Sequence, residues 1–75
     1  MIGRIVCSKQ GRDKGYFLVV VGMDNDKFLV CDGKERLLNN PKRKNPKHII
    51  KTNKQISEDL VLTDRALRKA LSKEV

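Results

Sequence analysis

The chain has 75 residues and a formal net charge of +8, with 17 Lys and Arg against 9 Asp and Glu. A chain this short forms one domain with a thin core, which leaves little room for a deep substrate cavity. Its apolar runs fall well short of the roughly 20 residues that span a bilayer, so we expect no membrane partner. The first ten residues lack the pattern of a secretory signal peptide, so we expect a cytoplasmic protein. We also expect it to be a monomer when free.

The positive charge is concentrated in the middle of the chain. Residues 34–54 carry eight basic side chains against Glu35 alone, whereas residues 1–33 net +1 and residues 55–75 are neutral. A lysine-rich segment can simply keep a small domain soluble. Clustering of charge in one segment instead favours a polyanionic partner, and we interpret it as a nucleic-acid-binding surface.

The first half of the sequence predicts three β-strands. A β-branched stretch at 2–8 is typical of a strand, and the continuous apolar run at 16–23 fits a strand that is buried on both faces or bent. Gly22 inside that run indicates a bend or a bulge. The polar residues 24–26 predict a turn into a third strand at 27–31, so the two segments should form a hairpin.

The second half predicts two shorter strands. Residues 36–39 are interpreted as a fourth strand and residues 48–51 as a fifth. The segment 40–46 between them is predicted to be a loop, because prolines cannot donate to a central ladder. Five short strands separated by turns favour a small β-barrel, which closes its edges on itself.

The C-terminal segment differs in character from the strands. Thr63 can cap a helix, and Asp64 suits the positive end of the helix dipole. We expect residues 1–52 to form the barrel and residues 53–75 to form a linker and a helix that packs on the barrel, covering an open edge. The helix would present Leu67, Ala70, Leu71 and Val75 on one face, and the linker would anchor through Ile56, Leu60 and Leu62.

Three segments together resemble a known motif. They are Gly3-Arg4-Ile5-Val6, Gly11-Arg12-Asp13-Lys14-Gly15 and Leu18-Val19-Val20-Val21, and in this order they are similar to the KOW motif of several ribosomal proteins and transcription elongation factors. The continuation through Asp32-Gly33 resembles the large-subunit ribosomal protein of the fourteen-e class. Small bacterial KOW-domain RNA-binding proteins of that class share the pattern at 41–48. The resemblance covers about residues 2–50.

This resemblance implies an SH3-like barrel that binds RNA, often ribosomal RNA, in the context of the ribosome and translation, with no catalysis. From the residues themselves, the glycine-bounded loop and the basic segment offer cations for phosphates, and Arg can also stack on a base. The candidate RNA-binding residues are Arg12, Lys14, Lys34, Arg36, Lys42, Arg43, Lys44, Lys47 and His48. Gly11, Gly15 and Gly33 are interpreted as structural loop residues.

Two aromatic side chains have alternative interpretations. Tyr16 could stack on an unpaired base, but as part of a dense apolar run it is expected in the core. His48 could contact RNA or pack at a strand end. With few exposed aromatics, recognition of folded RNA by shape and backbone is favoured over recognition of single strands.

Other functions find little support in the sequence. Cys7 and Cys31 are expected to be reduced and inert, and with His48 they fall short of the four ligands of a structural zinc site. No nucleophile, base and orienting group occur together, so we predict a protein that is not an enzyme and needs no cofactor. The alternative function is a protein-interaction adaptor of the transcription or translation machinery, acting through the hairpin edge or the helix.

Overall fold

The computed structural model describes residues 2–74 and shows one five-stranded antiparallel sheet with a C-terminal helix. The predicted roles of Val75 and of the Leu60 and Leu62 side chains lie outside the described residues. The strands are β1 (Arg4–Ser8), β2 (Phe17–Asp24), β3 (Lys27–Cys31), β4 (Lys42–Lys44) and β5 (Ile49–Gln55). The helices are α1 (Asp64–Leu71) and the 3-10 turns η1 (Pro46–His48), η2 (Glu58–Leu62) and η3 (Ser72–Glu74).

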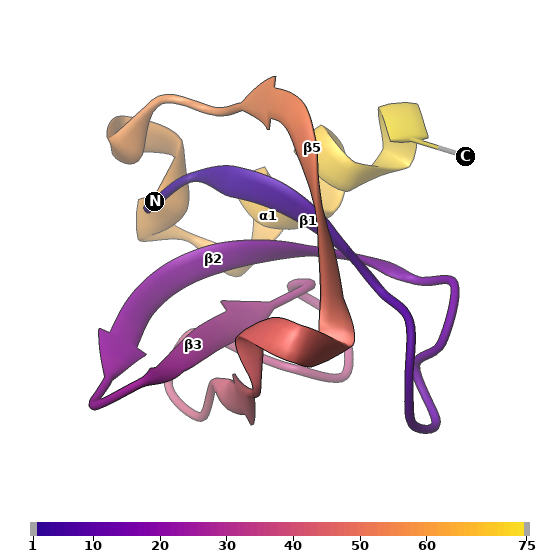
Figure 1. Cartoon of the computed structure of the whole chain (residues 1–75). Coiled ribbons are helices and arrows are strands. Elements are labelled where there is room, and N and C mark those ends of the chain that lie inside the picture. The colour runs from indigo at the N-terminus through magenta and orange to yellow at the C-terminus, as the bar shows by residue number, and fades with distance from the viewer. Residues whose placement is uncertain (1, 75) are drawn as a thin grey trace.

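The sheet has the strand order β4-β3-β2-β1-β5 and is open, which corrects the expectation of a closed barrel. β4, which is three residues long, forms one edge and pairs with β3 alone. β5 crosses the other strands steeply (Figure 1) and forms the second edge. The sheet is nevertheless strongly curled. β2 and β1 lie between β3 and β5 in the strand order, yet Phe28 of β3 and Ile49 of β5 belong to the same apolar cluster.

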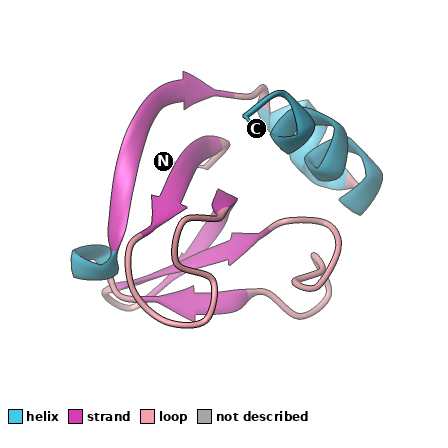
Figure 2. Cartoon of the chain, turned by 90° about the vertical axis from the view of Figure 1, so that its right-hand side faces the viewer, coloured by secondary structure: helices cyan, strands magenta, loops and turns pink. Residues whose placement is uncertain are grey.

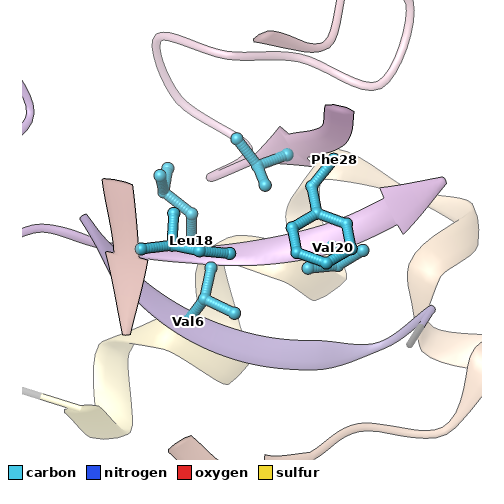
Figure 3. Packing of buried hydrophobic residues seen from close by; sticks show 6 residues of the cluster. Val6, Leu18, Val20 and Phe28 are labelled. Atoms are coloured by element: carbon cyan, nitrogen blue, oxygen red, sulfur yellow. The ribbon is translucent and has the colours of Figure 1, made fainter. Parts of the chain in front are cut away.

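The first half of β2 is buried on both faces, as the continuous apolar run predicts, whereas Met23 near its end is exposed. Leu18 and Val20 lie inside the curled sheet with Val6 and Phe28 (Figure 3). Val19, one residue on from Leu18, points to the other face because successive side chains of a strand alternate. The register of β2 against β3 shifts between Val20 and Gly22, so the bulge expected at that glycine is present.

The predicted fourth strand is in the wrong place. Residues 36–39 form turns, because the Asp32 carboxylate accepts the backbone N–H groups of Lys34 and Arg36 at 2.8 and 2.9 Å. The Arg36 carbonyl in turn accepts the N–H of Gly33 at 3.1 Å, which leaves this segment folded on itself.

The observed β4 lies instead within the segment predicted to be a loop. It pairs with β3 through Phe28↔Lys44 and Val30↔Lys42. The two prolines, Pro41 and Pro46, flank these three residues on either side, so neither interrupts the ladder at this edge of the sheet.

The fifth strand is longer than predicted. β5 extends to Gln55, which pairs with Arg4 of β1, so the first part of the expected linker belongs to the sheet. His48, expected in this strand, closes η1 instead, with its backbone N–H donating to the Asn45 carbonyl at 2.8 Å.

The C-terminal helix begins as predicted and packs on a face of the sheet, not over an edge. The Thr63 hydroxyl accepts the N–H of Ala66 at 3.1 Å, which is the expected cap. Leu67 is fully buried in a second cluster with Ile5, Val19 and Cys31. Leu71, expected on the apolar face of the helix, and Ile56, expected as an anchor of the linker, both pack against this cluster. Figure 2 shows α1 at one side of the strands and η1 at the opposite corner.

Replacing Leu67 by Ala tests the packing of the helix. The truncation leaves a cavity between α1 and the sheet, so we expect the free energy of unfolding to fall by about 2–5 kcal/mol in urea titrations followed by circular dichroism. The exposed Lys73→Ala change on the following turn is the control and should stay within about 0.5 kcal/mol of the wild type. Equal stability of the Leu67→Ala and Lys73→Ala variants would contradict the packing.

Candidate nucleic-acid interface

The loop between β1 and β2 is a tight, hydrogen-bonded structure. The backbone N–H of Gly15 donates to the Ser8 carbonyl at 2.7 Å, and the N–H of Lys14 donates to the Gly11 carbonyl at 3.2 Å. Gly11 and Gly15 have φ angles of +91° and +87°, which other residues adopt at a cost. Both glycines therefore shape the loop, and Arg12 and Lys14 are exposed on it.

The Asp13 carboxylate joins this loop to β4. It accepts a hydrogen bond from the Ser8 hydroxyl at 2.7 Å. It also forms ion pairs with two lysines, at 2.8 Å from Nζ of Lys44 and 3.4 Å from Nζ of Lys42. Lys44 also donates to the Gln10 carbonyl at 2.7 Å, and its side chain is only 6% exposed. Two basic segments that are about thirty residues apart in sequence therefore meet through one acidic side chain.

The pKa of Asp13 reflects this environment. Burial alone raises the pKa of a carboxyl group, but the hydrogen bonds from Lys44 and Ser8 and the charges of Lys44 and Lys42 outweigh burial and lower the pKa of Asp13 to about 2. The carboxylate is therefore charged at neutral pH, which is the state that holds the buried Lys44 ammonium.

Three of the candidate RNA-binding residues surround this junction with exposed side chains. Arg12 and Lys14 lie on the loop, and Lys47 lies on η1. The backbone N–H of Lys9 donates to the His48 carbonyl at 2.9 Å, which brings η1 against the start of the loop. We call the exposed side chains of Arg12, Lys14 and Lys47 the basic loop surface; His48 beside it is half-buried.

The other candidates lie elsewhere or serve the fold. Lys44 is buried in its ion pair, and Arg43 points away from it and lies 2.8 Å from the Asp24 carboxylate beside the β2–β3 turn. Lys34 and Arg36 are exposed on the turn that precedes β4. The nine candidates therefore do not form one surface.

The turn that carries Lys34 packs against α1. Gly33 has a φ angle of +78°, and a Cβ there would collide with the carbonyl oxygen of Asp64. The Gly33 carbonyl accepts Nη1 of Arg68 at 2.8 Å, and the Asp64 carboxylate accepts the N–H of Leu38 at 2.8 Å. The interpretation of Gly33 as a structural residue is consistent with this close approach.

Sequence reasoning missed the exposure of Tyr16. The expected core residue is 61% exposed, because β2 begins one residue later at Phe17 and Tyr16 still belongs to the loop. Its backbone carbonyl accepts the N–H of Ser8 at 2.9 Å, which fixes its position. The apolar run contained no signal that separated its first residue from the strand.

The two thiols, Cys7 and Cys31, are free. Burial raises the pKa of Cys31 to about 11, helped by the negative charges of Asp64 and Asp32, so this thiol is protonated at neutral pH. Cys7 is half-buried in β1. Among the described residues no three His, Cys, Asp or Glu side chains are grouped so that they could hold a metal ion.

No protein-family model matches the chain, and no curated protein matches it. None of the helices in the described part of the chain is long and apolar enough to cross a membrane.

The low pKa of Asp13 predicts a pH dependence of stability. Its folded value of about 2 lies below the ordinary 3.8, so the stabilisation is complete above about pH 4 and is lost as the pH falls through about 2. The shift corresponds to about 2 kcal/mol. Asp13→Asn should therefore be less stable than the wild type at pH 6 in urea titrations, and this difference should shrink towards pH 2.

A double variant separates the ion pair from general damage to the loop. Asp13→Asn alone leaves the Lys44 ammonium buried without its partner, whereas Asp13→Asn with Lys44→Met removes both charges. We expect the double variant to be the more stable of the two at pH 6. If the second substitution only adds to the loss, the ion pair is not the main contribution of Asp13.

Proposed function

We propose that this chain is a KOW-type, SH3-like RNA-binding module that docks on structured RNA, ribosomal or ribosome-associated, through the basic loop surface. The observation that carries the proposal is the meeting of the glycine-bounded loop with the basic segment at Asp13 and Lys44, which are 2.8 Å apart. Five antiparallel strands with this loop between the first two support the motif assignment.

The charges at this junction divide into two groups with different roles. Lys42, Arg43 and Lys44 each form an ion pair with an aspartate. Among residues 2–74, no such ion pair involves Arg12, Lys14 or Lys47. The second group can therefore meet phosphates without first losing a protein partner, and phosphate contacts supply most of the affinity of such surfaces.

The rigidity of the loop favours binding as well. Its backbone is closed by hydrogen bonds at both ends, and Asp13 and Lys44 tie its middle to β4. A surface that is ordered before binding loses less conformational entropy when it meets its partner. Shape and backbone recognition of a folded RNA suits such a surface, since it needs fixed cations more than base-reading side chains.

Removing two charges from the loop tests this proposal. We expect Arg12→Gln with Lys14→Gln to weaken binding to ribosomal RNA fragments about tenfold or more at near-physiological salt, because two charge-assisted contacts are lost. The slope of log affinity against log salt should fall by about 1.5–2 in filter-binding titrations.

The control removes the same charge elsewhere. Lys27→Gln with Lys73→Gln changes the start of β3 and the end of the helical segment, and should leave the affinity within about twofold of the wild type if position matters more than net charge. Equal losses of affinity in the two double variants would mean that the RNA is attracted only non-specifically.

Two further outcomes would count against the proposal. If the wild type binds ribosomal RNA no more tightly than an arbitrary duplex, the claim of specific binding is refuted. A protein partner that is still captured after nuclease treatment would favour the adaptor function.

A further inference from the structure

A groove runs between α1 and the turn that carries Lys34. It has a volume of about 1040 Å³, and Gly15, Tyr16 and Phe17 lie at one side of it. Four basic side chains line it, against two acidic ones, Asp32 and Glu35. The basic residues are Lys34, Arg65, Arg68 and Lys69.

Two of the charged side chains of this groove, Asp32 and Arg68, are held in place by hydrogen bonds to the backbone. The Asp32 carboxylate is engaged by the backbone N–H groups of Lys34 and Arg36, so it serves the turn. Arg68 is fixed by its hydrogen bond to the Gly33 carbonyl at 2.8 Å. Lys34, Arg65 and Lys69 are exposed. An anionic chain that enters the groove would therefore meet a fixed guanidinium and three mobile cations.

Tyr16 adds an aromatic ring to this basic lining. It is 61% exposed, while the next residue, Phe17, is packed into the core against the second cluster and anchors the backbone. Base–aromatic stacking beside a row of cations is the usual arrangement for binding unpaired nucleotides. A protein carboxylate partner would need the cations alone and would leave the exposed ring without a role.

The groove is also continuous with the basic loop surface. Gly15 ends the loop that carries Arg12 and Lys14, and the same residue lines the groove. An RNA that rests on the loop can therefore extend past Gly15 without leaving the protein. The loop faces the viewer in Figure 2, with α1 above and to one side of it.

We propose that this groove takes an unpaired segment of the RNA, with one base stacked on Tyr16 and the flanking phosphates bound by Lys34, Arg65, Arg68 and Lys69. The inference rests on the proposed RNA-binding function and gives it a second, chemically different subsite. Duplex is held at the basic loop surface, and a bulge, loop or end enters the groove, since unstacked bases are the ones that aromatic side chains can reach.

The ring of Tyr16 gives a direct readout, because the chain contains one Tyr and no Trp. We expect the Tyr ring signals in NMR spectra of the full chain to move upfield when a short oligoadenylate is added. An abasic oligonucleotide of the same length carries the phosphates without the bases and should leave these signals in place. Equal movement with both probes, or with neither, would overturn the stacking.

The second test compares the affinities for two RNA hairpins of equal length. One hairpin has a bulge, and the other is fully paired in its stem and closed by a stable tetraloop. Tyr16→Ala should weaken binding to the bulged RNA about tenfold, as the loss of one stacked base implies, and should not change binding to the paired one. Tyr16→Phe keeps the ring and should bind both RNAs like the wild type. Arg65→Gln should weaken binding to the bulged RNA more than Lys73→Gln does, because Arg65 lines the groove and Lys73 does not.

The outcomes separate this inference from the proposed function. If Arg12→Gln with Lys14→Gln weakens binding and Tyr16→Ala does not, the basic loop surface stands and the groove proposal fails. If Tyr16→Ala selectively weakens the bulged RNA while the loop variant binds normally, the groove stands and the loop is the wrong site. If neither RNA binds the wild type and the Tyr signals stay still, both proposals fail.

Discussion

The ion pair between Asp13 and Lys44 is the contact on which the arrangement of the candidate interface depends. It is largely shielded from water and includes a hydroxyl and a backbone carbonyl, so both charges are satisfied within the protein. Without it the loop between β1 and β2 would keep only the longer ion pair between Asp13 and Lys42, at 3.4 Å, as a charged attachment to β4. Asp13 thereby engages Lys42 and Lys44 within the fold, whereas Arg12, Lys14 and Lys47 form no such ion pair among residues 2–74.

The core supports this arrangement by using both faces of one short sheet. The curl of the sheet encloses Val6, Leu18 and Phe28, and α1 covers the opposite face through Leu67. The helix is therefore part of the core, and its outward side is free to form one wall of the groove beside Lys34.

The sequence was informative where local chemistry decides the structure and uninformative where distant partners do. The β2–β3 hairpin, the bulge at Gly22 and the cap at Thr63 follow from turn residues, periodicity and helix-end chemistry, and all three are present. The placement of β4 was missed because its pairing with β3 cannot be read from three charged residues. For the same reason Lys44 looked like a free cation: only the fold brings Asp13, far away in sequence, to its side.

The open sheet leaves two strand edges that could template pairing with other chains, and their composition discourages such aggregation. β4 is three residues long, consists of Lys42, Arg43 and Lys44, and is flanked by prolines. β5 carries Lys51 and Lys54 along its exposed length. Charges and prolines are the usual protection of edge strands. The basic residues of the middle segment thus have a second consequence, because charge at both edges of an open sheet disfavours the addition of strands from other chains.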